Sequence, residues 1–133
     1  TMFFQQDVEG DESEIQPSGI ITHSRGVVPL GWIAYLHLLC LQTHEDGDDI
    51  TLVTAKLFVD GVDASADWGA CSVIPNAQDV FSVVEPLAAP YVIDAREAER
   101  YYDMRVTTNG TAGGGTNVVD VLMRVQGLMF KAV

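Results

Sequence analysis

The chain has 133 residues, 47% of them hydrophobic, and a formal net charge of −12 at pH 7. A domain of this length can bury a core without disulfides or metal ions, and a charge of this sign, with no cluster of Lys and Arg, disfavours binding to nucleic acid or to anionic membranes. The hydrophobic fraction is high for so charged a chain, so part of its apolar surface is expected to lie against another chain.

The first 18 residues differ in composition from the rest of the chain. Phe3 and Phe4 precede five acidic residues, and Pro17 closes the stretch. This composition predicts an extended acidic arm over residues 1–18, followed by a folded domain over residues 19–133. Phe3 and Phe4 are adjacent, so on an extended strand they point to opposite faces. We therefore expect the arm to dock on a partner rather than to fill the core.

The sequence predicts neither a secretory signal nor a membrane span. The N-terminus has no basic segment followed by an apolar one, and a leading Thr fits a cytoplasmic chain that has lost its initiator Met. The longest apolar run, residues 27–41, is interrupted by Pro29 and is too short to cross a bilayer. Cys40 and Cys71 are therefore expected to be two reduced thiols rather than a disulfide.

From residue 19 onward, apolar and polar residues alternate with the period of a β-strand, and turn residues separate the runs. The predicted strands are residues 19–24, 30–42, 50–60, 68–74, 79–85, 90–94, 100–109, 117–126 and 128–132. So many short strands predict an all-β fold, an antiparallel two-sheet sandwich of jelly-roll or Greek-key type with the N-terminal arm extending from it. The only predicted helix is one turn at 95–100, where Asp94 and Glu97 could form a capping box.

The run 30–42 is apolar on both faces, which is typical of a strand covered on two sides. One face is expected to carry Trp32, Ala34, Leu36, Leu38 and Cys40. The opposite face is expected to carry Ile33, Tyr35, His37, Leu39 and Leu41.

No set of residues has the spacing of a metal site. The acidic loop 44–49 offers carboxylates to calcium, but it lacks the EF-hand spacing and its final Glu, so a solvated turn between two strands is favoured. His23, His37 and His44 do not match zinc-ligand spacings, and neither cysteine has a C-x-x-C partner. His37 is expected to be a core histidine. The sequence therefore predicts no bound metal and no cofactor.

Catalytic motifs are missing as well. The sequence has no G-x-S-x-G elbow, and no carboxylate lies among the apolar residues that would raise its pKa into the acid–base range. The glycine-rich segment 110–115 lacks the Lys of a P-loop and is expected to be a flexible hairpin tip. We therefore expect a protein that is not an enzyme.

Five of the aromatic residues admit two roles. They can form a sugar-stacking platform on one face of the sandwich, or they can belong to the core and to protein interfaces, where aromatic residues are common. The residues concerned are Trp32, Trp68, Tyr91, Tyr101 and Tyr102.

An acidic all-β chain without a signal, with an aromatic N-terminal arm, the run Tyr101–Thr108, a glycine-rich tip and a last segment Val118–Val133, resembles the small capsid-decoration (cement) proteins of tailed bacteriophages. The resemblance implies a jelly-roll domain, often trimeric, that clamps neighbouring capsid subunits at symmetry axes. No functional residue can be carried over from it.

We therefore expect a virion structural protein, assembled in the host cytoplasm, that self-associates as a trimer and stabilises a capsid shell. Its partners would be its own copies and the major capsid protein or another shell protein. The residues expected to dock on a partner are Phe3, Phe4, Tyr101 and Tyr102. The alternatives are a carbohydrate-binding β-sandwich module and a phage tail or fibre component.

Overall fold

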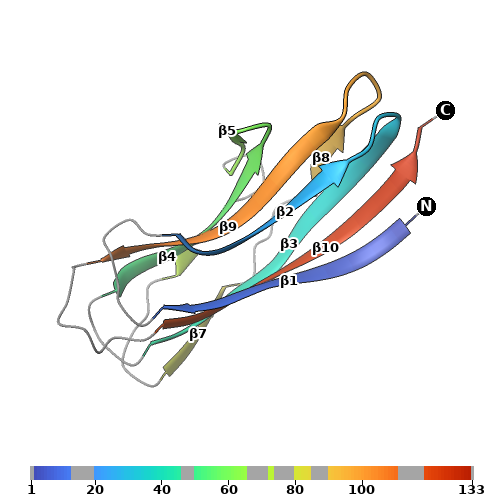
Figure 1. The fold of residues 1–133 in the computed structure, drawn as a ribbon. Coiled ribbons are helices and arrows are strands. Elements are labelled where there is room, and N and C mark those ends of the chain that lie inside the picture. Colours follow the sequence, from blue (N-terminus) through green and yellow to red (C-terminus); the bar gives the residue numbers. More distant parts are fainter. Residues whose placement is uncertain are drawn as a thin grey trace.

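The structure is a computed structural model that describes residues 2–12, 20–45, 50–65, 72–73, 80–84, 90–110 and 119–132. Within these ranges it is built from strands and contains no helix (Figure 1). The strands are β1 (Met2–Glu12), β2 (Ile20–Val28), β3 (Trp32–Glu45), β4 (Ile50–Val59), β5 (Val62–Asp63), β6 (Ser72–Val73), β7 (Val80–Val84), β8 (Tyr91–Asp94), β9 (Arg100–Gly110) and β10 (Val119–Lys131). The predicted all-β class is confirmed.

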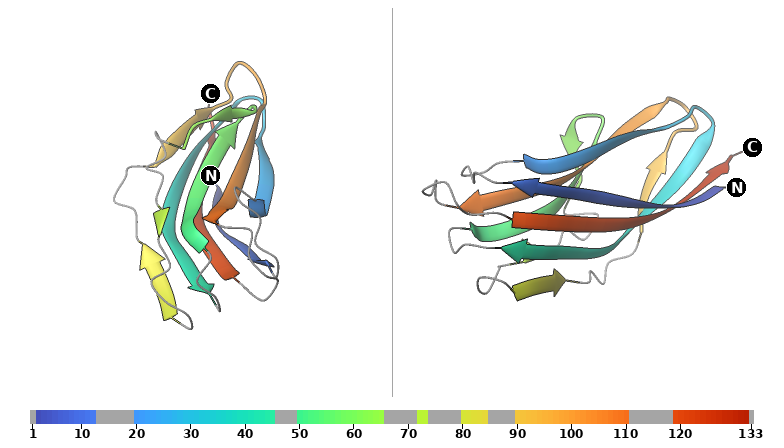
Figure 2. Two further views of the ribbon diagram at one scale, coloured as in Figure 1. Left: turned by 90° about the vertical axis from the view of Figure 1, so that its left-hand side faces the viewer. Right: turned by 60° about the horizontal axis from the view of Figure 1, so that its bottom comes forward.

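The strands form two antiparallel sheets that pack face to face (Figures 1 and 2). In sheet A the order is β1-β10-β3-β7, and β8 also pairs with β3; in sheet B it is β2-β9-β4-β5, and β6 also pairs with β4. Strands β1 to β4 alternate between the sheets, and β10 and β9 insert between them. This interleaving is the jelly-roll arrangement of two Greek keys, so the predicted sandwich is also confirmed.

The core lies between the sheets and is made of the inward-facing residue of each alternating pair. Leu36 and Leu38 of sheet A and Leu57 and Met104 of sheet B are each no more than 1% exposed. Burial of such a side chain contributes about 1.5–3 kcal/mol. The alternation that predicted the strands therefore also selects the core.

The N-terminal stretch differs from the expectation. Residues 2–12 of the predicted arm pair with β10 along their whole length, from Met2 opposite Met129 to Glu12 opposite Val119. They form the edge strand of sheet A, and Val8 is 2% exposed. The free edge of β10 offers these backbone groups hydrogen-bond partners. Phe4, Gln6 and Val8 are two residues apart, so their side chains share one face of the strand. That face turns inward, although the composition of the segment is acidic.

Each sheet has an aromatic ring lying over a glycine of the neighbouring strand. In sheet A, Phe4 is opposite Gly127; in sheet B, Tyr102 is opposite Gly26. A Cβ at either glycine would come within 3.0 Å of ring atoms, closer than real Cβ atoms approach. Each glycine thus leaves room for the ring to pack inward. Strand β10 runs unbroken through Gly127, where the sequence predicted a break.

Strand β3 contains a bulge that the sequence does not reveal. Arg124 of β10 lies opposite Cys40, whereas Val125 lies opposite Leu38, so Leu39 is an extra residue on β3. An extra residue reverses the alternation beyond it. Leu41 consequently faces the core and is 0% exposed. The prediction that Leu41 lies on the face opposite Leu36 and Leu38 is wrong.

The connection between β8 and β9 also differs from the expectation. Residues 96–98 form bends rather than a helical turn. The carboxylate of Asp94 accepts a hydrogen bond from the backbone N–H of Arg96, 3.0 Å away, and the Arg96 guanidinium returns to the same carboxylate. This two-residue contact closes a turn in which the side chain replaces a backbone acceptor, and it does not start a helix.

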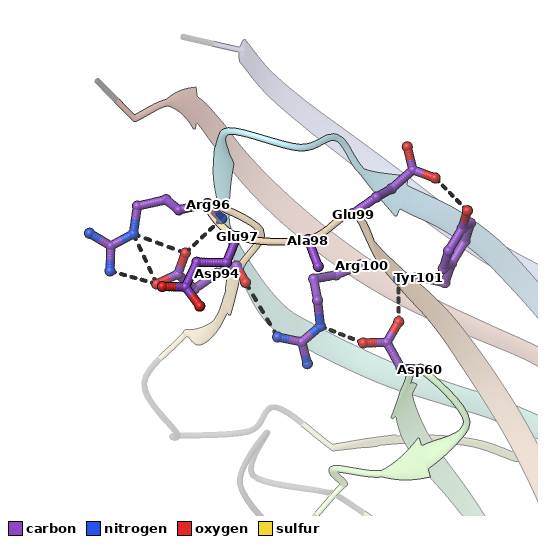
Figure 3. A pocket seen from close by; sticks show the side chains of 8 residues that line it. All are labelled: Asp60, Asp94, Arg96, Glu97, Ala98, Glu99, Arg100 and Tyr101. Atoms are coloured by element: carbon purple, nitrogen blue, oxygen red, sulfur yellow. Dashed lines mark hydrogen bonds and ion pairs between the residues drawn. The ribbon is translucent and has the colours of Figure 1, made fainter.

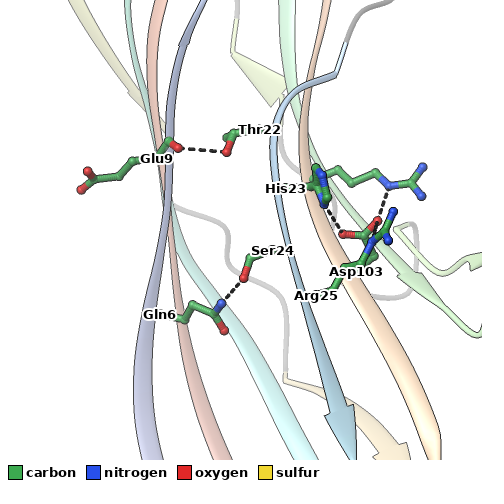
Figure 4. Close-up of polar contacts among 8 residues, drawn as sticks. Gln6, Glu9, Thr22, His23, Ser24, Arg25 and Asp103 are labelled. Atoms are coloured by element: carbon green, nitrogen blue, oxygen red, sulfur yellow. Dashed lines mark hydrogen bonds and ion pairs between the residues drawn. The ribbon is translucent and has the colours of Figure 1, made fainter.

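The two sheets are joined along one side by side chains of their edge strands. Gln6 of β1 donates a hydrogen bond to the hydroxyl of Ser24 of β2 (Figure 4). The hydroxyl of Thr22 donates to the carbonyl of Glu9, 2.9 Å away. These bonds occupy part of the edge of β1, which would otherwise offer unpaired backbone groups to another chain.

On the opposite edge, Ser65 takes the place of a strand partner for β4. Its hydroxyl accepts a hydrogen bond from the buried N–H of Leu57 at 3.0 Å and donates to the carbonyl of Leu57 at 3.4 Å. Ser65→Ala should therefore destabilise the fold by about 1–3 kcal/mol, because it leaves a buried N–H without an acceptor. Urea unfolding would measure the change. Thr22→Ala, which removes an exposed hydroxyl, is the control, and equal losses for the two variants would contradict the prediction.

Candidate functional site

An apolar row crosses the outer face of sheet A. Phe3 of β1 lies opposite Leu128 of β10, which lies opposite Tyr35 of β3, and Tyr35 lies opposite Val92 of β8. Residues directly opposite one another share a face of the sheet. Phe3 is 72% exposed and Val92 is 47% exposed, and the two residues between them are half-buried. We call these four residues the apolar row.

The apolar surface continues one row toward the end of the sandwich where both chain termini lie (Figure 1). Phe130 of β10 lies opposite Ile33 of β3, and both are half-buried. The Phe130 ring stacks on the ring of Tyr35, with centroids 5.7 Å apart. The stacked rings fix the shape of this surface without a partner present.

A row of polar side chains without Asp, Glu, Lys or Arg borders the apolar row on its other side. Gln5 of β1 lies opposite Gln126 of β10, which lies opposite His37 of β3. A hollow of about 300 Å³ lies between the two rows; its lining residues, which include no Asp, Glu, Lys or Arg, are Phe3, Tyr35, His37, Pro90, Gln126, Gly127 and Leu128. A surface without formal charge can approach another acidic chain with little repulsion.

The four residues expected to dock on a partner do not form one site. Phe3 and Tyr101 are exposed, by 72% and 58%, but Phe3 lies on the outer face of sheet A and Tyr101 on that of sheet B. Phe4 and Tyr102 turn inward over their glycines. In Phe3–Phe4 and in Tyr101–Tyr102, the first ring thus lies on an outer face and the second points toward the core. Successive side chains of a strand must point to opposite faces in this way.

The outer face of sheet B is charged and is organised around a buried carboxylate. Asp103 of β9 is only 8% exposed. Its Oδ2 accepts a hydrogen bond from Nε of Arg105 at 2.7 Å and lies 3.7 Å from Nε of Arg25 (Figure 4). Its Oδ1 lies 3.4 Å from Nδ1 of His23 and makes no hydrogen bond to the residues described. Three basic side chains thus converge on one carboxylate.

A hollow of about 790 Å³ lies at the end of the sandwich beside the β8–β9 connection (Figure 3). Arg100 pairs with Asp60, whose carboxylate also accepts the backbone N–H of Tyr101. Hydrogen bonds from the Arg96 side chain lower the pKa of Asp94 to about 2, and the hydroxyl of Tyr101 donates to Glu99. Because these groups bind one another, we interpret the cluster as the contact that fastens this connection to the β4–β5 turn.

The residues considered for metal binding do not meet in the part of the chain described, where no three His, Cys, Asp or Glu side chains are grouped to hold an ion. His37 is half-buried on the outer face of sheet A, not in the core as expected. Residues 46–49, Cys71 and residues 111–115 lie outside the described residues. Within the described part of the chain, no helix is long and apolar enough to cross a membrane.

The aromatic residues considered for sugar stacking are also dispersed. Trp32 and Tyr91 pack against the core, and Tyr102 is buried within it. Tyr101 alone of the four described is exposed, and Trp68 lies outside the described residues. An aromatic platform does exist, but it is the Phe3, Tyr35 and Phe130 surface of sheet A.

Leu128, Phe130 and Val92 of that surface were not singled out by sequence reasoning. The sequence signal was present: residues 128–130 are all apolar, so both faces of β10 are apolar at that end. The same pattern in the run 30–42 predicted cover on two sides. Which residues of the two runs meet depends on the register of β3 with β10, which the sequence pattern does not give.

Comparison with known proteins assigns no family. No family model and no curated protein matches the sequence. A part of the insecticidal delta-endotoxin Cry8Ea1 of Bacillus thuringiensis is similar in structure, at 12% identity and a TM-score of 0.46, over 89% of this chain and 19% of the toxin. Desmodium yellow mottle tymovirus gives 10% identity and a TM-score of 0.36 over 99% of this chain and 89% of the other. A family two carbohydrate esterase from Cellvibrio japonicus gives 9% identity and 0.31 over 99% and 36%. Likenesses at this level assign no function.

Proposed function

We propose that this protein is a non-enzymatic structural protein that self-associates and stabilises a larger protein shell, in the manner of the phage capsid-decoration proteins that its sequence resembles. The apolar row on the outer face of sheet A supports the proposal most directly. The outer face of an antiparallel sheet in a sandwich is usually polar and solvated. Here it combines exposed Phe3 and Val92 with the half-buried rings of Tyr35 and Phe130.

Covering the apolar row by a partner favours association. Covering one Phe, Leu or Val side chain contributes about 1.5–3 kcal/mol when it is fully excluded from water. Forming a complex costs roughly 4–15 kcal/mol in lost freedom of motion. Several side chains must therefore be covered together, and four residues in register, with Phe130 and Ile33 beside them, form such a group on each copy.

In this proposal the apolar row joins copies of the chain, and a trimer is the expected assembly. The assembled protein contacts a shell subunit of a virion that is built in the host cytoplasm. Interfaces between permanent partners are more apolar than transient ones. A self-contact centred on the apolar row and the hollow beside it, whose lining includes no Asp, Glu, Lys or Arg, also keeps the −12 charges of the copies apart. Both points favour the apolar row as the surface of self-association.

The experiment is a mass measurement on the purified chain. Light scattering after size exclusion should give a multiple of 14.4 kDa, and Phe3→Ser combined with Val92→Ser should weaken assembly by about tenfold or more, since roughly 1.4 kcal/mol corresponds to tenfold. Both side chains are exposed in the single chain, so folding should be little affected.

Val62→Ser is the matched control, because Val62 is 69% exposed but lies outside the apolar row, on β5 of sheet B. A wild-type chain that stays a monomer at high concentration, or a control that weakens assembly equally, would contradict the proposal.

Shell stabilisation is tested separately. The proposal expects the chain to cosediment with capsid shells of the phage that encodes it. The absence of a capsid gene near its own gene would argue against that part of the proposal.

A carbohydrate-binding module is the second candidate, because uncharged hydrogen-bonding groups border exposed rings on the same face. Gln5, Gln126 and His37 lie in register beside the apolar row. Sugar rings stack on aromatic faces while such side chains bind their hydroxyl groups. Gln126→Ala separates the two candidates: it should abolish binding on a glycan array if sugars bind here, and it should leave the assembled mass unchanged if copies associate here.

A further inference from the structure

The outer face of sheet B carries a second cross-strand row, and it is basic. His23 of β2 lies opposite Arg105 of β9, and Arg105 lies opposite Lys56 of β4. Adjacent strands are about 4.8 Å apart, so the row spans roughly 10 Å. Arg25 lies on the same face, two residues from His23 along β2. We call these four residues the basic row.

Arg105 is held in place by a hydrogen bond to Asp103, and Arg25 lies within ion-pair distance of the same carboxylate. Both direct Nε toward the carboxylate of Asp103, at 2.7 Å for Arg105 and 3.7 Å for Arg25. The guanidinium of Arg105 also lies 4.0 Å from the centre of the Phe58 ring. An arginine fixed through Nε keeps its terminal N–H groups for another acceptor. The side chain of Arg25 is 73% exposed, so those groups are accessible.

The basic row has more positive charge than its own carboxylates balance. Elsewhere in the described chain each of three arginines has an aspartate to itself: Arg96 with Asp94, Arg100 with Asp60 and Arg124 with Asp7. In the basic row Arg25 and Arg105 share Asp103. Asp63 is the other nearby acid, and its pKa is lowered first by hydrogen bonds from Ser65 and only then by the charges of Lys56 and Arg105. The two Arg and Lys56 therefore outnumber the two acids even with His23 neutral.

We propose that the outer face of sheet B binds an extended acidic segment of a partner protein. Carboxylates two residues apart on an extended chain lie on one side, roughly 7 Å from each other. Two of them reach across the roughly 10 Å of the row, and arginine guanidinium groups bind carboxylates by paired hydrogen bonds. The net charge of −12 does not prevent this, because charges farther away than the Debye length of about 8–10 Å are largely screened.

This inference does not rest on the proposed function, because it uses the face of the sandwich opposite the apolar row. A protein with both faces occupied would be joined to its copies by sheet A and to a different, acidic chain by sheet B. Each contact can be removed without the other, so the two hypotheses fail separately.

The test measures binding of a fluorescent peptide with alternating Ser and Glu to the full chain, by anisotropy at about 0.1 M salt, where the Debye length is about 10 Å, and again at about 1 M salt, where it is about 3 Å. Binding should be saturable, should weaken at the higher salt, and should weaken by about tenfold or more in Lys56→Glu. Lys56 makes no ion pair with the residues described, so its replacement removes none of the contacts to Asp103. Lys131→Glu changes the charge equally at the end of β10 and should bind within about twofold of wild type.

Absence of saturable binding would overturn the proposal, as would an equal loss in Lys131→Glu, which would show a general charge effect. Tighter binding of hexagalacturonate than of the peptide, with the same dependence on Lys56, would replace the protein segment by an acidic glycan. The mass of Lys56→Glu is measured alongside. An unchanged mass together with lost peptide binding supports two separate faces, and loss of assembly would show that the basic row serves self-association instead.

Discussion

Replacing Gly127 with valine is expected to destabilise the protein by about 1–3 kcal/mol, as overpacking of a well-packed site does. A Cβ at this position would meet the ring of Phe4 at less than 3.0 Å, so the ring must leave its place over β10. Phe4 packs against the core and lies near the N-terminal end of β1, on its inward face. Displacing it should also loosen the pairing of β1 with β10. Urea unfolding would measure the loss.

The double variant Gly127→Val with Phe4→Ala tests whether contact with the Phe4 ring causes the loss of stability. Each change alone should be costly, but the valine methyl groups would occupy part of the space that the missing ring leaves. The combined loss should therefore be smaller than the sum of the two by about 0.5–3 kcal/mol, the coupling expected of residues in contact. Strict additivity would mean that Gly127 is required for its backbone and not for the space that it leaves to Phe4.

Leu41→Ala is expected to have the largest effect of the substitutions considered, about 2–5 kcal/mol, which is typical of a leucine removed from a closed core. Leu41 is 0% exposed and lies opposite Met123, which is also 0% exposed. This burial depends on the bulge at Leu39, because without the extra residue Leu41 would share the outer face with Tyr35. The variant therefore tests the bulge as well as the packing, and thermal or urea unfolding would measure the change.

Leu39→Ala is the matched control, because the same number of atoms is removed from a half-buried residue two positions away. It should destabilise the fold by less than about 1.5 kcal/mol, in proportion to the smaller apolar area that it removes from water. If Leu39→Ala proved the more harmful of the two, β3 would run without the bulge, and the surface that we assign to association would have a different set of residues.

Alternation along the chain was sufficient to determine the all-β class and most strand positions. In Thr54–Val59 and in Tyr101–Val106 every second residue is apolar, and those residues face the core. The alternation is local, so it can be read without knowing which strands pair. The same local property divided Phe3 from Phe4 and Tyr101 from Tyr102. The apolar character of both faces of the run 30–42 likewise indicated a strand with a second covered face.

Tertiary structure alone decided which residues meet. The acidic residues 2–12 became a strand because β10 offers an edge with which their backbone groups can pair, and composition carries no record of that edge. The bulge at Leu39 arises from the fit of β3 to β10, and it reverses the faces beyond it. Both outer rows join residues from strands distant in sequence, Phe3 with Leu128 and His23 with Arg105. Register is set by pairing and packing across the whole sandwich, and a pattern with a period of two residues repeats identically in all registers that differ by an even number of residues.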